Sequence, residues 1–422
     1  MSSALLVALA LALASAWTIH VHGTWLAPGA LFLCMWSAIL SIAALTFPDV
    51  PETTLGFIWI ALACLSFEGG AWLQQRTSVL SRRSSHARVP SIRGVVLAIT
   101  LTGLILVVVI LARGGLSLRE LSVRAIIQLT VVNRSDKYAG LNPQTRLEWL
   151  SYVTLYFGTL LGGWLFGESA RFRDRVLALM PLVIIAVVFL LYGSRFGALY
   201  GGIFWIAGYI TAAVLSATRT ADPSSMTGPS ASAGTAVLRV AATAATLVFA
   251  LSVLTQLVRY GGAEHVGWRA ILADAFSYPV AFSIWISDHP FTAANMTAGA
   301  RAFAKVTGVL GLSVDPLPAI PVGFTSSNIY TVFRDLVEDF GSIGMLVLLA
   351  CAGRIAQAAF DATSRGSLVA AAVLVVAYAS VFSTAAVSIF FYAAPTLALL
   401  VFFLYMCTPK LREVLSMSSR DG

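Results

Sequence analysis

Uncharged apolar stretches of about twenty residues recur along this chain of 422 residues. A helix rises 1.5 Å per residue, so about 17–25 residues cross the roughly 30 Å of hydrocarbon in a bilayer. Hydrophobic residues make up 58% of the chain and charged residues 11%, against about 25% charged in ordinary soluble domains. A water-soluble globule is therefore excluded. The sequence predicts an all-α, polytopic bundle of transmembrane helices that forms a single integral membrane domain over residues 1–422.

The apolar stretches give eleven candidate spans, and the total could be ten or twelve because the last two share a junction. The spans cover 3–20, 26–47, 54–72, 94–112, 149–167, 176–193, 197–216, 237–258, 340–353, 367–387 and 388–407. The first has no basic n-region and no cleavage site before the next span, so we expect a retained helix rather than a signal peptide. The ninth is short, and we expect it to extend into the segment before it.

The loop between the third and fourth spans orients the bundle. It carries five arginines and no acidic residue: Arg76, Arg82, Arg83, Arg88 and Arg93. Short loops of this kind stay in the cytoplasm, which places the N-terminus outside. Residues 217–236, rich in Ser, Ala, Gly and Pro, then form a flexible cytoplasmic linker. The loop 113–148, with an expected interfacial amphipathic helix, and the large loop 259–339 both lie on the extracytoplasmic side.

Several classes of chemistry have no support in the sequence. The chain contains no GxxxxGK[ST], HExxH or GxSxG motif. Its cysteines lie inside apolar stretches without CxxC or Cys/His spacing, namely Cys34, Cys64, Cys351 and Cys407. Basic charge gathers on the predicted cytoplasmic side, where anionic lipid accounts for it. We therefore expect no metal, no cofactor and no nucleic-acid partner.

Arg195 stands between two apolar spans with almost no loop around it. A charge at this boundary is costly unless it is paired or reaches water, so an arginine there is a candidate functional residue. Gly193 and Gly197 leave room for a ligand, and a guanidinium matches phosphate oxygens with two parallel hydrogen bonds. The pattern predicts a phosphate-binding arginine. The alternative is a hairpin arginine whose long side chain reaches the interface.

A second group of polar residues lies within 315–344, DPLPAIPVGFTSSNIYTVFRDLVEDFGSIG. Three prolines and a glycine lead to Thr325, Ser326 and Ser327, any of which could cap a helix that begins near Asn328. The free N–H groups and positive dipole end of such a helix favour a diphosphate.

On the helix that follows, charged residues fall on neighbouring stripes. Tyr330, Arg334 and Glu338 share one face at i, i+4 and i+8. Asp335 and Asp339 form the adjacent stripe. The alternative to a ligand site is an interfacial Tyr/Arg anchor with its salt bridges.

The stretch SSNIYTVFRDLVEDFGSIG resembles the N-x-Y-T and D-F-G-x-x-G signature of Wzy-type oligosaccharide repeat unit polymerases, the O-antigen polymerase family. The matching positions are Asn328, Tyr330, Thr331, Asp339, Phe340, Gly341 and Gly344. A glycine–serine–arginine segment of that family is similar to Gly193, Ser194 and Arg195. The number of spans and the loop sizes agree in outline. Family members commonly have both ends inside, which differs from the topology deduced above.

The resemblance implies a glycosyltransferase of the bacterial cytoplasmic (inner) membrane, acting on the extracytoplasmic face. It would join oligosaccharide units carried on undecaprenyl diphosphate into a surface or secreted polysaccharide. The implied partners are the polyprenyl-diphosphate-linked oligosaccharide and membrane lipids, with a chain-length regulator and a repeat-unit flippase as further candidates. The alternatives are an O-antigen ligase-like lipid-sugar transferase, and a flippase or transporter for lipid-linked glycans.

Such a reaction needs cations for the diphosphate leaving group and a base near the acceptor hydroxyl. We assign Arg195 and Arg334 to the diphosphate and Asp339 to the base. Asp288 with His289 is a competing pair for the base, ahead of His265 and Asp274. The expected substrate-binding residues are Asn328, Tyr330, Thr331, Arg269, Arg301 and His289.

Overall fold

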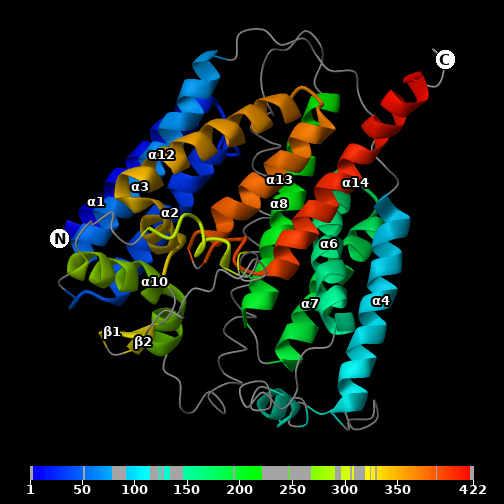
Figure 1. Ribbon diagram of the computed structural model, residues 1–422, viewed down its shortest axis with the longest axis horizontal. Helices are drawn as coiled ribbons and strands as arrows, with labels where there is room; N and C mark the ends of the chain where they lie inside the picture. The colour runs from blue at the N-terminus through cyan, green and yellow to red at the C-terminus, as the bar shows by residue number, and fades with distance from the viewer. Residues whose placement is uncertain are drawn as a thin grey trace.

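The chain forms an all-α bundle with one small β-hairpin in the computed structural model (Figure 1). The structure describes residues 3–50, 53–77, 92–114, 122, 125, 128–133, 146–192, 195–220, 246, 268–289, 296–304, 307, 319–323, 325–327, 330–385 and 387–418. Within them, seven helices are long and apolar enough to cross a membrane, which makes this a membrane protein. The seven are α1 (Ser3–His22), α2 (Pro28–Thr46), α3 (Thr53–Thr77), α4 (Ile92–Arg113), α7 (Phe172–Leu191), α8 (Arg195–Thr220) and α12 (Val332–Thr363).

Four further helices complete the described bundle: α6 (Arg146–Glu168), α10 (Trp268–Asp288), α13 (Leu368–Ser383) and α14 (Ala393–Ser418). Helices occur at ten of the eleven expected spans, and the span 237–258 lies outside the described residues except for position 246. The ninth span lies in α12, which has 32 residues and is interrupted at Gly341, so its continuous part runs on to Thr363, beyond the expected end at 353. Helix α10 lies within the loop expected at 259–339, in a part of that loop for which no individual helix was predicted.

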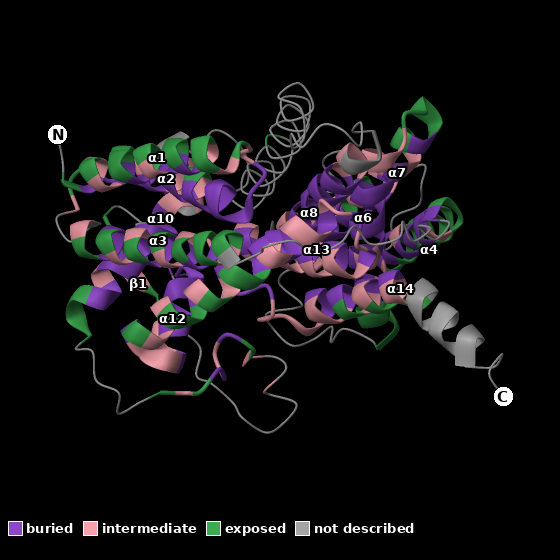
Figure 2. Cartoon of the chain, turned by 90° about the horizontal axis from the view of Figure 1, so that it is seen from above, coloured by how far each residue is buried: buried purple, intermediate pink, exposed green. Residues whose placement is uncertain are grey.

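The helices pack around two hydrophobic cores, and Figure 2 shows the buried residues along the helices that enclose them. One core, here the α12 core, joins α1, α2, α3, α10 and α12 around fully buried aromatic side chains such as Trp36, Phe282 and Phe333. The other, the α8 core, joins α4, α6, α7, α8, α13 and α14 around Trp164 and Phe204. The two halves meet along α13, which contacts α2, α8 and α12.

Glycine allows α12 to lie directly on α3. A Cβ at Gly353 would overlap the carbonyl oxygen of Phe67, and one at Gly70 would overlap the carbonyl oxygen of Ala350. Small residues at a helix crossing let the two backbones approach closely, which is the usual way that membrane helices gain packing contacts. This close crossing fixes the position of α12 against the first three helices.

The capping prediction for Thr325, Ser326 and Ser327 is wrong. These residues form β2 (Thr325–Ser327), which pairs antiparallel with β1 (Ile320–Val322) through Ile320↔Ser327. Gly323 has a φ of 56° at the turn, where a glycine is preferred, so the chain folds into a hairpin instead of entering a helix. Helix α12 begins later, at Val332, and the preceding Thr331 makes no side-chain capping bond.

A break at Gly341 divides α12 into two parts. This glycine has φ 72° and ψ 170°, a conformation outside the helical region that other residues rarely adopt. Residues 342–363 have a length of about 33 Å, enough to cross the hydrocarbon without the first part. We call residues 332–340 the leading segment of α12. Because of the break, the axis of the leading segment need not follow the axis of residues 342–363.

Candidate functional site

The leading segment of α12 is held inside the α12 core by apolar contacts. Phe333 is fully buried, and its ring centroid lies 5.0 Å from that of Trp36. The N–H of Val332 donates to the carbonyl oxygen of Thr384, at 3.1 Å. These contacts anchor the start of the segment, so the charged residues that follow have a fixed backbone.

Arg334 is buried, with 5% of its side chain exposed. Its guanidinium carbon lies 3.9 Å from the ring centroid of Tyr330 and 4.8 Å from that of Trp285. Its Nε donates to Oε1 of Glu338 at 2.9 Å, as the i, i+4 spacing predicted. Cation–π contacts hold the guanidinium plane while leaving N–H groups unused.

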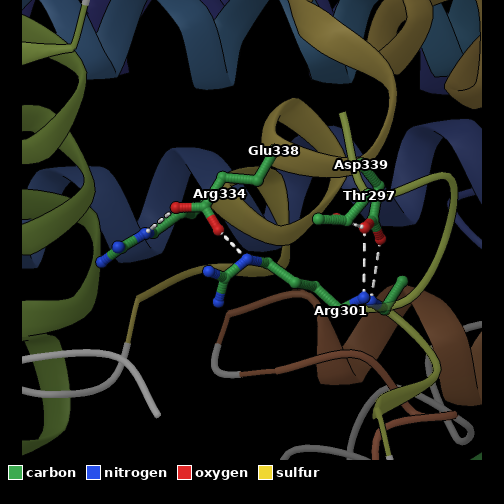
Figure 3. Close-up of polar contacts among 6 residues, drawn as sticks. Thr297, Arg301, Arg334, Glu338 and Asp339 are labelled. Carbon is green, nitrogen blue, oxygen red and sulfur yellow. Dashed lines mark hydrogen bonds and ion pairs between the residues drawn. The ribbon is translucent and has the colours of Figure 1, made fainter. Parts of the chain in front are cut away.

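Glu338 joins two arginines across one carboxylate, as Figure 3 shows. Its second oxygen forms an ion pair with Nε of Arg301. The side chains of Arg301 and Glu338 are 20% and 17% exposed, so this pair is largely shielded from solvent. Arg301 belongs to a segment, 296–304, that lies next to the leading segment of α12.

Asp339 fastens that segment to α12. Its carboxylate accepts hydrogen bonds from Thr297 Oγ1, from the N–H of Arg301 at 3.1 Å and from the N–H of Ala302 at 2.9 Å (Figure 3). The residue is 1% exposed. Three donors already occupy the two oxygens, which favours a positioning role. Its role as the base stays a prediction.

Asp335 is a third acid in this cluster, and no role was assigned to it from the sequence pattern. It is 5% exposed and lies within electrostatic range of Arg301, Arg334, Glu338 and Asp339. Its carboxylate forms no ion pair in the part of the chain that the structure describes. Two guanidinium groups therefore stand among three carboxyl groups.

Three buried polar side-chain atoms, on Arg334, Trp285 and Thr331, have no hydrogen-bond partner among the described residues. They are Nη1 of Arg334, Nε1 of Trp285 and Oγ1 of Thr331. Buried polar atoms are nearly always paired, so unpaired ones need an explanation. Two of the three can only donate, and the hydroxyl can also donate. Together they suit a ligand rich in acceptor oxygens, such as a phosphate group.

Most of the residues expected to bind substrate or act in catalysis that are described lie in this site. Tyr330, Thr331, Arg301, Arg334 and Asp339 come together between α10, α12 and the segment 296–304. Trp285 also contacts Arg334. No local pattern predicts that contact, because the two residues belong to different helices.

The remaining predicted residues are described in part. His289 directly follows α10, and its ring stacks on that of Trp285 with centroids 4.9 Å apart. Arg195 is the first residue of α8 and Arg269 lies in the first turn of α10, but their side chains, like Asn328, lie outside what the structure describes. Tyr200, in the second turn of α8, is within electrostatic range of Asp335. The beginning of α8 therefore approaches the site.

A second polar cluster lies near the other end of α12. His22 Nε2 is 3.0 Å from Oε1 of Glu68, and their side chains are 2% and 14% exposed. Asp361 accepts a 2.8 Å hydrogen bond from Gln357 and lies within electrostatic range of His22. This cluster places ionisable groups inside the bundle.

No group of three or more His, Cys, Asp or Glu residues in the described part of the chain is arranged to hold a metal ion. Comparison with known proteins gives no match to a family model, to a curated protein or to a solved structure.

Proposed function

We propose that this protein is a polymerase that joins polyprenyl-diphosphate-linked oligosaccharide units at the outer face of the bacterial cytoplasmic membrane. The observation that carries the proposal is the buried guanidinium of Arg334, held by Tyr330 and Trp285 with Nη1 unpaired. A rigid cation with a free donor suits the oxygens of a diphosphate. The resemblance of the surrounding sequence to the O-antigen polymerase family supports the same reading.

The reaction requires stabilisation of charge on the leaving group. As the bond between the sugar and the diphosphate breaks, negative charge grows on the diphosphate oxygens. Donors already fixed in a shielded site stabilise that charge without reorganising during the reaction. Arg334 has this character, and Arg301, tied to it through Glu338, is a second cation beside it. Arg195, at the nearby start of α8, is our candidate for a third.

The experiment is Arg334→Lys in the native host, with the surface polysaccharide and its lipid-linked intermediates separated by size. Lysine keeps the charge but loses the planar fork, so we expect long chains to disappear while single units still reach the outer face. Arg354→Lys, an exposed arginine on the same helix that bonds to Gln74, is the matched control. Normal chain length in the Arg334 variant would refute the proposal.

Deletion of the gene separates the related activities. Loss of long chains, with single units exported, is expected for a polymerase. Long chains that stay on their lipid carrier would instead identify an O-antigen ligase-like transferase.

A flippase or transporter for lipid-linked glycans is the second candidate, and the cluster of His22 and Glu68 favours it. Buried ionisable pairs inside membrane bundles often serve ion-coupled transport. Repeat units trapped on the cytoplasmic leaflet after deletion, and the same defect in Glu68→Gln, would support this function. Export of single units by the Glu68→Gln variant would argue against it.

A further inference from the structure

His289 is held in one tautomer by its own helix. Its Nδ1 lies 2.8 Å from the carbonyl oxygen of Trp285, one turn earlier in α10. A carbonyl oxygen can only accept a hydrogen bond, so Nδ1 carries the hydrogen. In the neutral ring, Nε2 is then left with its lone pair available to accept a proton.

The same contact places the imidazole beside the proposed anion site. Its ring stacks on the indole of Trp285 at 4.9 Å with an interplanar angle of 27°. The guanidinium carbon of Arg334 lies 4.8 Å from that indole centroid, so His289 is within about 10 Å of Arg334. Unlike the leading segment of α12, His289 is exposed, so a substrate hydroxyl can reach it.

Two of the three acids of the site, Glu338 and Asp339, are less suited to accepting a proton, and the third, Asp335, is only 5% exposed, so an acceptor hydroxyl reaches it less easily than it reaches His289. Glu338 is ion-paired with two arginines, and Asp339 accepts three hydrogen bonds. Protonating either carboxyl would remove interactions that hold the site together. A histidine with one fixed nitrogen and one available nitrogen has the arrangement that general-base catalysis requires.

We propose that His289 is the general base of the transfer reaction, a role that rests on the proposed polymerase function. Nε2 of His289 takes the proton of the acceptor hydroxyl. The hydroxyl oxygen forms a bond to the anomeric carbon of the donor sugar. The bond from that carbon to the diphosphate oxygen breaks, and the electron pair leaves with the polyprenyl diphosphate, facing Arg334. The imidazolium then returns its proton to solvent.

The test uses full-length protein in lipid vesicles supplied with lipid-linked repeat units. His289→Gln removes the base but keeps an amide that can donate to the Trp285 carbonyl. We expect its kcat to fall by about 10²–10⁴-fold with little change in KM. His289→Ala should show the same loss and recover part of its rate on addition of imidazole, which a purely structural defect would not do. His20→Ala, an exposed histidine on α1, is the matched control.

Binding of farnesyl diphosphate separates this inference from the function beneath it. His289→Gln should bind that lipid as the unmodified protein does, whereas Arg334→Lys should not. If His289→Gln polymerises normally, or if imidazole restores nothing to His289→Ala, the base is another residue, while an inactive Arg334→Lys still supports the polymerase. If the unmodified protein neither binds farnesyl diphosphate nor polymerises, the proposed function itself fails.

Discussion

Each half of the bundle pairs a glutamate with an arginine, but the arginine is half-exposed in one pair and buried in the other. In the α8 core, Glu148 is 8% exposed and pairs with Arg113, which is 52% exposed. Tyr192 also donates to this glutamate, at 3.3 Å. In the α12 core the arginine, Arg334, is the buried member.

The difference separates a structural pair from a candidate ligand site. A buried acid met by a surface arginine and a phenol has its oxygens supplied with donors. A buried guanidinium that donates to only one carboxylate keeps N–H groups without an acceptor. Nη1 of Arg334 is such a group. Counting unused donors therefore distinguishes the two pairs better than counting charges does.

The largest expected effect tests that distinction directly. Arg334→Met should reduce the initial rate of polymer formation in vesicles by at least about 100-fold, since it removes a fixed donor for the leaving group. Arg113→Met should lower the melting temperature, because Glu148 loses its cation, yet keep most of the rate. Equal loss of activity in both variants would refute the distinction between a structural pair and a ligand site.

A smaller effect is expected where Asp339 fastens the segment 296–304. Asp339→Asn weakens charge-assisted bonds to two backbone N–H groups, at a cost of about 2 kcal/mol in stability. Trypsin should then cut after Arg301 faster than in the unmodified protein. Asp335→Asn is the control, because no hydrogen bond from that segment to Asp335 is found in the described residues. Unchanged cleavage in the Asp339 variant would remove its positioning role.

The smallest effect concerns the surplus acid of the site. Burial raises the pKa of Asp335 to about 7. At pH 8.5, where this carboxyl is ionised, Asp335→Asn removes a negative charge close to two guanidinium groups, so we expect farnesyl diphosphate to bind about 3- to 10-fold more tightly. Glu148→Gln, in the other half, should leave this binding unchanged. Weaker binding by the Asp335 variant would mean that its carboxylate holds part of the ligand.

The helices and the contact between Arg334 and Glu338 could be predicted, because both follow from the spacing of residues close together in the sequence. Apolar stretches marked α12 and its neighbours, and the i, i+4 spacing predicted the contact of Arg334 with Glu338. The contacts of Arg334 with Trp285 and of Asp339 with Thr297 could not be predicted, since they join separate segments. The cap expected at Thr325–Ser327 failed because Gly323 favours a hairpin there.

The break at Gly341 also bears on how the protein meets its membrane. A bilayer that is thicker or thinner changes the tilt of helices that cross it. Since residues 342–363 reach across without the leading segment, a change in their tilt can be taken up at the broken turn. The contact between the guanidinium of Arg334 and the ring of Trp285 would then stay the same in bilayers of different thickness. We expect that polymer formation by the Gly341→Ala variant depends on the acyl-chain length of the surrounding lipids, and that polymer formation by the native protein does not.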